Sequence, residues 1–175
     1  MRVFAALQPS AAFLEALTDL QTRLRAAGTE GRYLHPSDLH MTLAFIGEWP
    51  EDVTDVLPPV GKPFSVTLSR IGVFPQAKVL WAGVEESDRL NDLALRVRRN
   101  LRNAGIPFDP QDFNPHITLI RKPVLPSEAL LAQIGPAPVS MTVREVCLYR
   151  SEHRAEGMTY TVIGRKTQDD QEHCV

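Results

Sequence analysis

Two short stretches of the chain carry the same four-residue pattern. Residues 39–47 read LHMTLAFIG and residues 115–121 read PHITLIR, so both contain His-x-Thr-Leu. The chain has five histidines in 175 residues, and random ordering of its composition would give roughly 0.04 matches to the pattern. The repetition therefore indicates either a structural repeat or one site built from two copies. Both require a fold with two comparable halves.

The spacing of apolar residues predicts two long helices. One begins after Ser10, a good N-cap residue, and ends at Gly28. The other spans residues 89–104 and ends at Gly105. Two shorter helical segments are expected within residues 50–57 and 126–135. Apolar and β-branched runs predict strands over residues 2–7, 40–47, 64–74, 79–84, 116–120, 139–150 and 158–164.

This order places one strand-helix-strand unit in each half, with a motif on the strand after each long helix. We therefore predict an α+β fold that is bilobal and duplicated, with pseudo-twofold symmetry. Two antiparallel-rich sheets should face a central cleft and the helices should lie outside. Residues 1–175 should form a single domain of two intertwined lobes, with a frayed polar tail over residues 167–175.

Side chains alternate between the two faces of a strand. His40 and Thr42 should therefore share one face of their strand, while Met41, Leu43 and Phe45 share the other. The same alternation places His116 with Thr118, and puts Ile117 and Leu119 behind them. A single His-Thr pair on a strand is usually partly buried and hydrogen-bonded, with a structural role only. Two pairs at matching places in two halves would instead meet across one cleft.

Two imidazoles that face one ligand suit acid–base chemistry, because one can accept a proton while the other donates one near neutral pH. Two threonine hydroxyls can donate hydrogen bonds to phosphate oxygens. Asp38 and Glu48 flank the first motif, yet no paired acidic motif is present, which disfavours a metal-dependent hydrolase. The net charge of −2 gives no general attraction to nucleic acid, so a local site must hold an anionic ligand.

The paired H-x-T-L motifs resemble those of the 2H phosphoesterase superfamily, and most closely its RNA 2′,3′-cyclic phosphodiesterases, also called 2′-5′ RNA ligases. The resemblance extends over RVFAALQP, LHMTLAFIGE, VLWAGV, FNPHITLIR and the closing LYRS…GMTYTVI. It implies hydrolysis of a ribose 2′,3′-cyclic phosphate to a 2′-phosphate, and a reversible 2′-5′ RNA ligation in some members. Because the His and Thr groups suit displacement at a phosphodiester without a metal, we expect no cofactor. The segment PEDVTDVLPPVGK is shorter than the helix usual in the family, which affects rim contacts only.

The resemblance assigns His40 as the proton donor to the leaving 3′ oxygen and His116 as the proton acceptor that activates water. Spacing alone leaves these two roles interchangeable. Thr42 and Thr118 would bind the phosphate. Arg121 matches an arginine that follows the second motif in the family, and would offset charge on the transition state. Strand alternation places Arg121 on the face opposite His116, unless the strand ends by residue 120.

Other polar and aromatic residues are weaker candidates. His35 is expected in a surface loop near the cleft, and His153 and His173 at the surface. The basic residues of the second long helix could form a solvated outer face or a track for an RNA backbone; they are Arg96, Arg98, Arg99 and Arg102. Ser151 follows LYR without an assignable role. Candidates for base stacking, most of them expected in the core, are Phe4, Tyr33, Phe74, Trp81, Phe113 and Tyr149.

The expected partners are RNA ends or nucleotides that bear a 2′,3′-cyclic phosphate. Two alternatives remain: a phosphodiesterase for another substrate, such as 2′-5′ oligoadenylate or an ADP-ribose cyclic phosphate, or a nucleotide-binding module without turnover. The sequence contains no 18-residue apolar span and no signal-peptide pattern, so we expect a cytoplasmic protein that does not bind membranes. No exposed apolar patch is evident, so we expect a monomer. Cys147 and Cys174 are expected to be reduced thiols.

Overall fold

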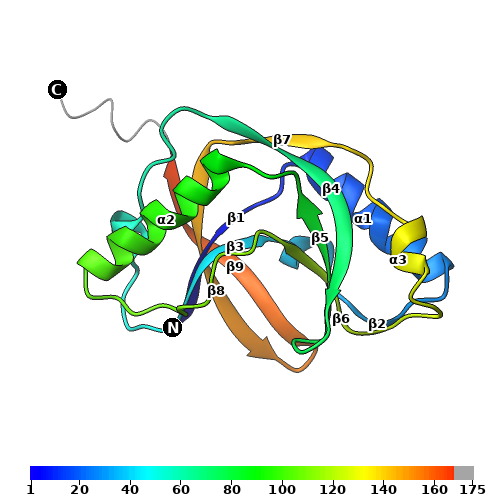
Figure 1. Cartoon of the computed structure of the whole chain (residues 1–175). Helices are drawn as coiled ribbons and strands as arrows, with labels where there is room; N and C mark the ends of the chain where they lie inside the picture. Colours follow the sequence, from blue (N-terminus) through cyan, green and yellow to red (C-terminus); the bar gives the residue numbers. More distant parts are fainter. Residues whose placement is uncertain (168–175) are drawn as a thin grey trace.

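The computed structural model describes residues 1–167 as a strongly curled, mostly antiparallel sheet with two long helices (Figure 1). The strands are β1 (Arg2–Leu7), β2 (Glu30–Tyr33), β3 (Met41–Glu48), β4 (Phe64–Phe74), β5 (Val79–Val84), β6 (Ile117–Val124), β7 (Ser140–Val143), β8 (Glu145–Arg154) and β9 (Gly157–Thr167). The helices are α1 (Ala11–Ala26), α2 (Asp88–Asn103) and the short α3 (Leu130–Gln133), with 3-10 turns η1 (Pro36–Asp38) and η2 (Thr54–Val56). The mixed α and β content and the antiparallel pairing confirm the predicted fold class.

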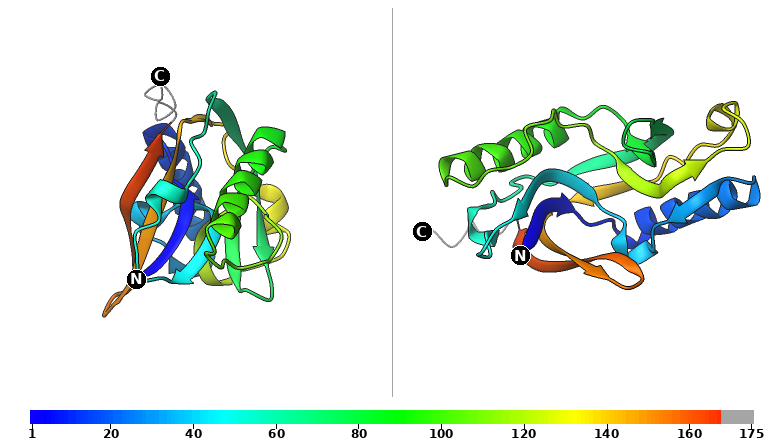
Figure 2. Two further views of the ribbon diagram at one scale, coloured as in Figure 1. Left: turned by 90° about the vertical axis from the view of Figure 1, so that its left-hand side faces the viewer. Right: turned by 90° about the horizontal axis from the view of Figure 1, so that it is seen from below.

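The strands follow one hydrogen-bonded path, in the order β7-β4-β5-β6-β3-β1-β8-β9, with β2 added to β6. The halves of this path are β7-β4-β5-β6 and β3-β1-β8-β9. They meet at β3 and β6, where Met41 opposite Ile117 is the register pair that joins them. The two predicted sheets are therefore two halves of one sheet that curls at a narrow junction, and Figure 2 shows this curl in two further views.

The long helices form for the reasons the sequence suggested. The Ser10 Oγ accepts a hydrogen bond from the Phe13 N–H at 3.2 Å, and the Ser87 Oγ accepts one from the Leu90 N–H at 3.1 Å. These side chains satisfy N–H groups that lack partners in the first turn. The residues that α1 buries completely are Phe13, Leu17, Leu20 and Leu24. Those that α2 buries are Leu90, Leu93, Ala94, Val97 and Leu101. Each of these side chains larger than alanine contributes roughly 1.5–3 kcal/mol to folding.

The two halves exchange elements along the chain. The helix α1 follows β1 but packs against β6 and β7 of the other half, and α2 follows β5 but packs against β3 (Figure 1). The stretch 139–150, predicted as one strand, breaks at Arg144, because β7 pairs with β4 whereas β8 pairs with β1. The interlocking means that each motif strand is supported by the helix of the opposite half.

Other local expectations are corrected by the structure. Residues 50–57 form only the 3-10 turn η2, because the Asp52 carboxylate accepts hydrogen bonds from the Thr54 N–H and hydroxyl and Pro58 follows directly. The strand β2 was not predicted. Thr167, placed in the frayed tail, pairs with Glu145 at the end of β9, and residues 168–175 lie outside the described residues. Within residues 1–167, no helix is both long enough and apolar enough to cross a membrane.

Candidate active site

The two His-x-Thr-Leu motifs meet where β3 and β6 pair. Met41 and Ile117, which hold the same place in the two motifs, lie directly opposite each other in an antiparallel register. Equivalent residues that face each other in this way place a pseudo-twofold axis between the strands. Both side chains are buried in the core, so the residues on either side point to the opposite face.

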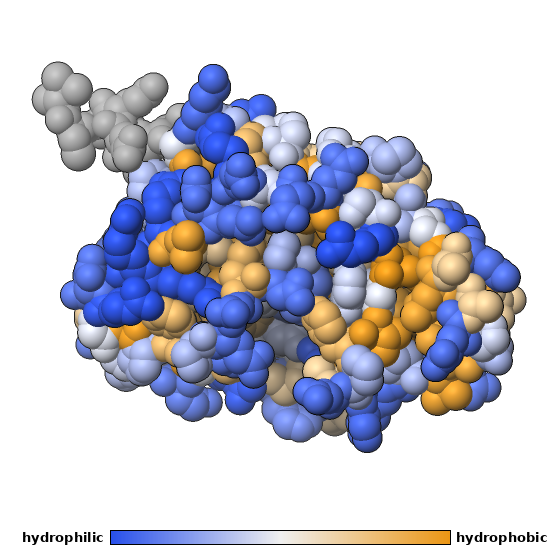
Figure 3. Space-filling model, in the orientation of Figure 1, coloured by the Kyte–Doolittle hydropathy of each residue, from blue (hydrophilic) through white to orange (hydrophobic). Residues whose placement is uncertain are grey.

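Extending this register by one residue places His40 beside Thr118 and His116 beside Thr42. The two imidazoles then lie on a diagonal, where Cα atoms are about 7–8 Å apart. All four residues line one hollow of about 970 Å³. The face drawn in Figure 1 is hydrophilic over α2 and has a recess near its lower centre (Figure 3). The structure therefore brings together the four motif residues predicted for the site.

Each motif strand contains a β-bulge at the leucine of the motif. On β3, Thr42 pairs with Ala6 and Ala44 pairs with Ala5, which leaves Leu43 as an extra residue. On β6, Thr118 pairs with Trp81 and Ile120 with Leu80, which leaves Leu119 as an extra residue. A bulge reverses the alternation of faces beyond it. Two consecutive residues of each strand are consequently buried in the same core.

The bulges change which side chains reach the site. Strand alternation placed Phe45 in the core and Arg121 opposite His116, and both expectations are wrong. Beyond the bulges, both residues line the hollow that contains the two histidines. Arg121 reaches the site although β6 continues to Val124, so the predicted end of the strand at residue 120 is not the reason. The two residues occupy equivalent places in the repeat, one aromatic and one cationic.

A polar side chain from a long helix supports each bulge. The Leu119 carbonyl accepts a hydrogen bond from the Gln21 Nε2 of α1 at 3.0 Å. The Leu43 carbonyl accepts one from the Arg98 Nε of α2 at 3.2 Å. Arg98 also donates to the Gln111 carbonyl at 2.7 Å, and Arg96 donates to the carbonyls of Pro59 and Val60. These two arginines of α2 are thus bound to the protein's own backbone, which argues against a continuous RNA track on this helix.

Backbone carbonyls fix the orientation of both imidazoles. The His40 Nδ1 lies 2.7 Å from the carbonyl oxygen of Asp38, and the His116 Nδ1 lies 2.6 Å from that of Asn114. A carbonyl oxygen can only accept, so each Nδ1 carries a proton. The Nε2 of each neutral ring is then free of its proton and available for catalysis.

Aromatic side chains enclose His40. Its ring centroid lies 4.7 Å from that of Phe4, 4.9 Å from that of Tyr160 and 5.5 Å from that of Tyr149. The pKa of His40 is lowered from 6.5 to about 4. Burial among these rings is the main cause and the positive charges of Arg121 and His116 add to it, while the hydrogen bond to the Asp38 carbonyl opposes the shift. Free His40 is therefore neutral at pH 7.

His116 has a less enclosed setting. Its ring meets the edge of Phe74, with the centroids 5.0 Å apart. Burial lowers the pKa of His116, and its hydrogen bond to the Asn114 carbonyl opposes this shift. The two histidines thus differ in environment although their motifs are equivalent.

The structure places the weaker candidates at the margins of the site. The His35 Nδ1 lies 2.7 Å from the Ser37 Oγ in a hollow next to the site. His153 and the buried Ser151 line a third hollow beside His40, where the Ser151 Oγ donates to the Arg2 carbonyl at 3.5 Å. Of the aromatic candidates, Phe74 and Phe113 line the hollow between the histidines. His173 and Cys174 lie outside the described residues.

Sequence reasoning missed two residues that organise the site. The Tyr160 hydroxyl accepts a hydrogen bond from Arg121 Nη2 at 3.2 Å. The Asp38 carboxylate accepts one from the Tyr160 N–H at 3.1 Å, while the Asp38 carbonyl holds His40. Together they join η1 and β9 around the first histidine. Asp38 flanks the first motif and Tyr160 lies in the quoted GMTYTVI segment, but only the tertiary pairing shows the connection.

The comparisons with known proteins identify the family. A model described as the 2′-5′ RNA ligase superfamily matches residues 8–155. The chain is 29% identical to an RNA 2′,3′-cyclic phosphodiesterase of Thermotoga maritima, covering 93% of both proteins, and 30% identical to one of Methanothermobacter thermautotrophicus, covering 92% of this chain and 95% of that protein. The crystal structure of E. coli LigT complexed with 3′-AMP matches with a TM-score of 0.77 at 28% identity, over 95% of this chain and 97% of that one. The chain belongs to the 2′-5′ RNA ligase superfamily.

Proposed function

We propose that the chain hydrolyses 2′,3′-cyclic phosphates at the ends of RNA or on nucleotides, using His40 and His116 without a metal ion. The observation that carries the proposal is the twofold register of Met41 and Ile117, which brings both His-Thr pairs to one face. The names of the relatives support the reaction, and the complex of E. coli LigT with 3′-AMP supports a nucleotide ligand.

In the proposed reaction, His116 Nε2 accepts a proton from water as the water attacks the phosphorus. His40 Nε2 donates a proton to O3′ as the P–O3′ bond breaks on the opposite side. The product is a 2′-phosphate with a free 3′ hydroxyl. The diagonal placement of the two rings suits this geometry, because the attacking and leaving oxygens lie on opposite sides of the phosphorus.

The acid role of His40 requires that its pKa rise when substrate binds. The positive charges of Arg121 and His116 help to lower its pKa in the empty site. An anionic phosphate between these groups offsets those charges and favours the imidazolium form. Substrate binding would thus prepare the proton that the leaving oxygen needs.

The remaining groups of the site would bind and stabilise the phosphate. Thr42 and Thr118 line the same hollow as the histidines, and their hydroxyls can donate to the two nonbridging oxygens. Arg121, held by the Tyr160 hydroxyl, would offset the charge that develops in the pentacoordinate transition state.

A 5′ hydroxyl of a second RNA could take the place of water. His116 would accept its proton, the new P–O5′ bond would form, and the same P–O3′ bond would break, which leaves a 2′-5′ linkage. The hollow of about 970 Å³ beside His116 has room for a nucleophile much larger than water, and the description of the family supports this reaction.

The test is incubation of the protein with 2′,3′-cyclic AMP, with and without EDTA, followed by chromatographic identification of the product. We expect 2′-AMP at equal rates in both conditions. Formation of 3′-AMP would contradict the proposed bond cleavage, and loss of activity in EDTA would contradict the metal-free mechanism. Tight binding of nucleotide without any turnover would indicate a binding module, and faster hydrolysis of 2′-5′ oligoadenylate would indicate a different substrate.

A further inference from the structure

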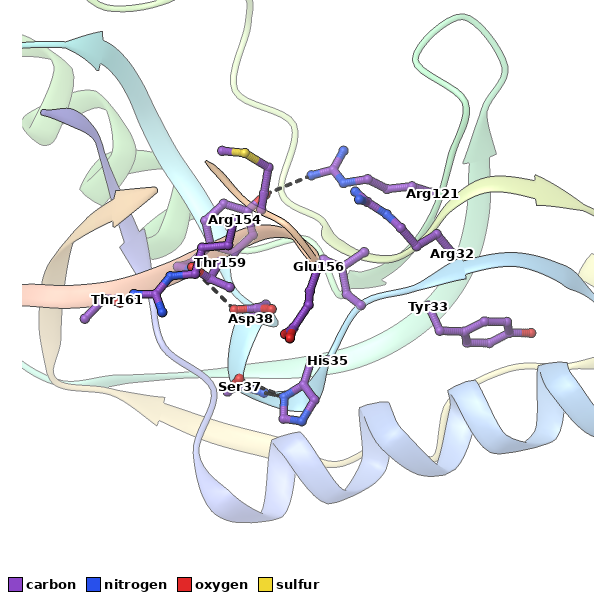
Figure 4. Close-up of a pocket in the computed structure, with 13 residues that line it drawn as sticks. Arg32, Tyr33, His35, Ser37, Asp38, Arg121, Arg154, Glu156, Thr159 and Thr161 are labelled. Carbon is purple, nitrogen blue, oxygen red and sulfur yellow. Dashed lines mark hydrogen bonds between the residues drawn. The ribbon is translucent and has the colours of Figure 1, made fainter. Parts of the chain in front are cut away.

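A second hollow, of about 580 Å³, adjoins the site beyond Arg121 and Tyr160. It lies between β2, the η1 turn and the β8–β9 hairpin, and Figure 4 shows the side chains that line it. Arg121 and Tyr160 border both this hollow and the one beside His40. An RNA strand that leaves the site on the His40 side can therefore enter this second hollow directly.

Two arginines lie next to each other at the border of this hollow. Arg32 on β2 is the direct register partner of Arg121 on β6, and Figure 4 shows the two guanidinium groups side by side. Like charges directly opposite on neighbouring strands are destabilising. Within residues 1–167, neither arginine forms a salt bridge with a carboxylate. An arrangement that costs stability and lacks a compensating anion is typical of a binding site.

Neither acidic group of this hollow forms an ion pair with Arg32 or Arg121. The Asp38 carboxylate accepts the Tyr160 N–H, and the Glu156 carboxylate points toward the loop of His35, away from the two guanidinium groups (Figure 4). The other cation, Arg154, is bound to Glu152 at 3.1 Å. The arginines of this hollow that lack an ion-pair partner within the described chain are thus Arg32 and Arg121.

Among the described residues, the opposite side of the site has no excess of arginines over carboxylates. The hollow beside His116 is lined by the carboxylates of Asp109 and Asp112. Two arginines, Arg98 and Arg121, also line this hollow. The Arg98 guanidinium donates to the carbonyls of Leu43 and Gln111. An RNA strand, which carries one negative charge per nucleotide, is therefore more favoured on the Arg32 side, where arginines outnumber carboxylates, than on the Asp109 side.

We propose that Arg32, which lies beside Arg121, binds the backbone phosphate that precedes the terminal cyclic phosphate of an RNA strand, while Arg121 stays at the terminal phosphate. The strand leaves the site past His40 toward the β8–β9 hairpin, and the attacking water enters from the His116 side. This arrangement rests on the proposed function. It also makes His40 the residue nearest the leaving O3′, because the ribose and the leaving oxygen lie on the same side of the phosphorus as the strand.

The test compares a substrate that has the inner phosphate with one that lacks it. The kcat/KM values are measured for 2′,3′-cyclic AMP and for a trinucleotide that ends in a 2′,3′-cyclic phosphate, with wild type and Arg32→Gln. The variant should lower kcat/KM for the trinucleotide about tenfold, as expected for one charge-assisted contact, and leave that for 2′,3′-cyclic AMP within about twofold. The salt dependence of trinucleotide KM should weaken by about 0.7 in log–log slope.

Arg99→Gln is the matched control, because it removes the same charge from an exposed position on α2. It should change neither substrate. A loss of trinucleotide activity in Arg99→Gln but not in Arg32→Gln would place the strand along α2 and overturn the inference, as would an unchanged substrate ratio in Arg32→Gln. If wild type fails to hydrolyse 2′,3′-cyclic AMP, the proposed function itself fails.

Discussion

The buried imidazole of His40 makes a quantitative prediction about stability at acid pH. A fall of its pKa from 6.5 to about 4 on folding corresponds to about 3.4 kcal/mol in favour of the neutral ring. Between these two values the unfolded chain binds a proton that the folded protein does not, so stability rises with pH in this window. The contribution is fully present above pH 6.5 and is lost as the pH falls toward 4.

The assay is urea unfolding of wild type and His40→Asn from pH 7.5 to 4.5. The asparagine amide can still donate to the Asp38 carbonyl, but it does not titrate. Wild type should lose about 2.5 kcal/mol more than the variant over this interval. Other groups, including His116, titrate in both proteins and cancel in the difference. Curves that remain parallel within about 0.5 kcal/mol would refute the reasoning, because burial would then not hold His40 neutral.

Three further predictions follow from the site. The pH profile of kcat/KM for 2′,3′-cyclic AMP should be bell-shaped, and the apparent pKa values of both limbs should lie below 6.5, because burial lowers the pKa of both histidines. A profile that rises to a plateau beginning above pH 7 would contradict this. With bis(p-nitrophenyl) phosphate, whose leaving group needs no proton, His40→Ala should lose far less activity than His116→Ala, and the reverse order would exchange the two roles. Gln21→Leu should lower the unfolding free energy by about 1–3 kcal/mol in urea titrations, because it removes a hydrogen bond to the buried Leu119 carbonyl, and an unchanged midpoint would show that the bulge does not depend on it.

The sequence predicted the parts of the fold that local periodicity determines. Both long helices are found with the expected buried faces, and α1 has the expected Ser10 cap, because helical spacing and capping are local properties. The exchange of helices between halves and the break at Arg144 depend on which distant strands pair. No local pattern in the sequence carries that information.

The candidate site was predictable as far as the repeat extends. The pairs His40–Thr42 and His116–Thr118 lie together because the motif is short enough for strand alternation to hold. One residue later the bulge at each leucine reverses the alternation, so the expected positions of Phe45 and Arg121 failed. Arg32 lies on the short, polar strand β2, which has no apolar pattern, and its place beside Arg121 arises only from the register of β2 with β6.

The central claim is that His40 and His116 act on one phosphate as a unit. Its most direct test is the kcat/KM for 2′,3′-cyclic AMP of His40→Ala, His116→Ala and the double variant. Each single change should lower kcat/KM by a factor of about 10²–10⁴. The double variant should have a kcat/KM only slightly below that of the less active single variant, because the effects of residues that act together are strongly non-additive. Losses that multiply in the double variant, or near-wild-type activity in either single variant, would contradict the account.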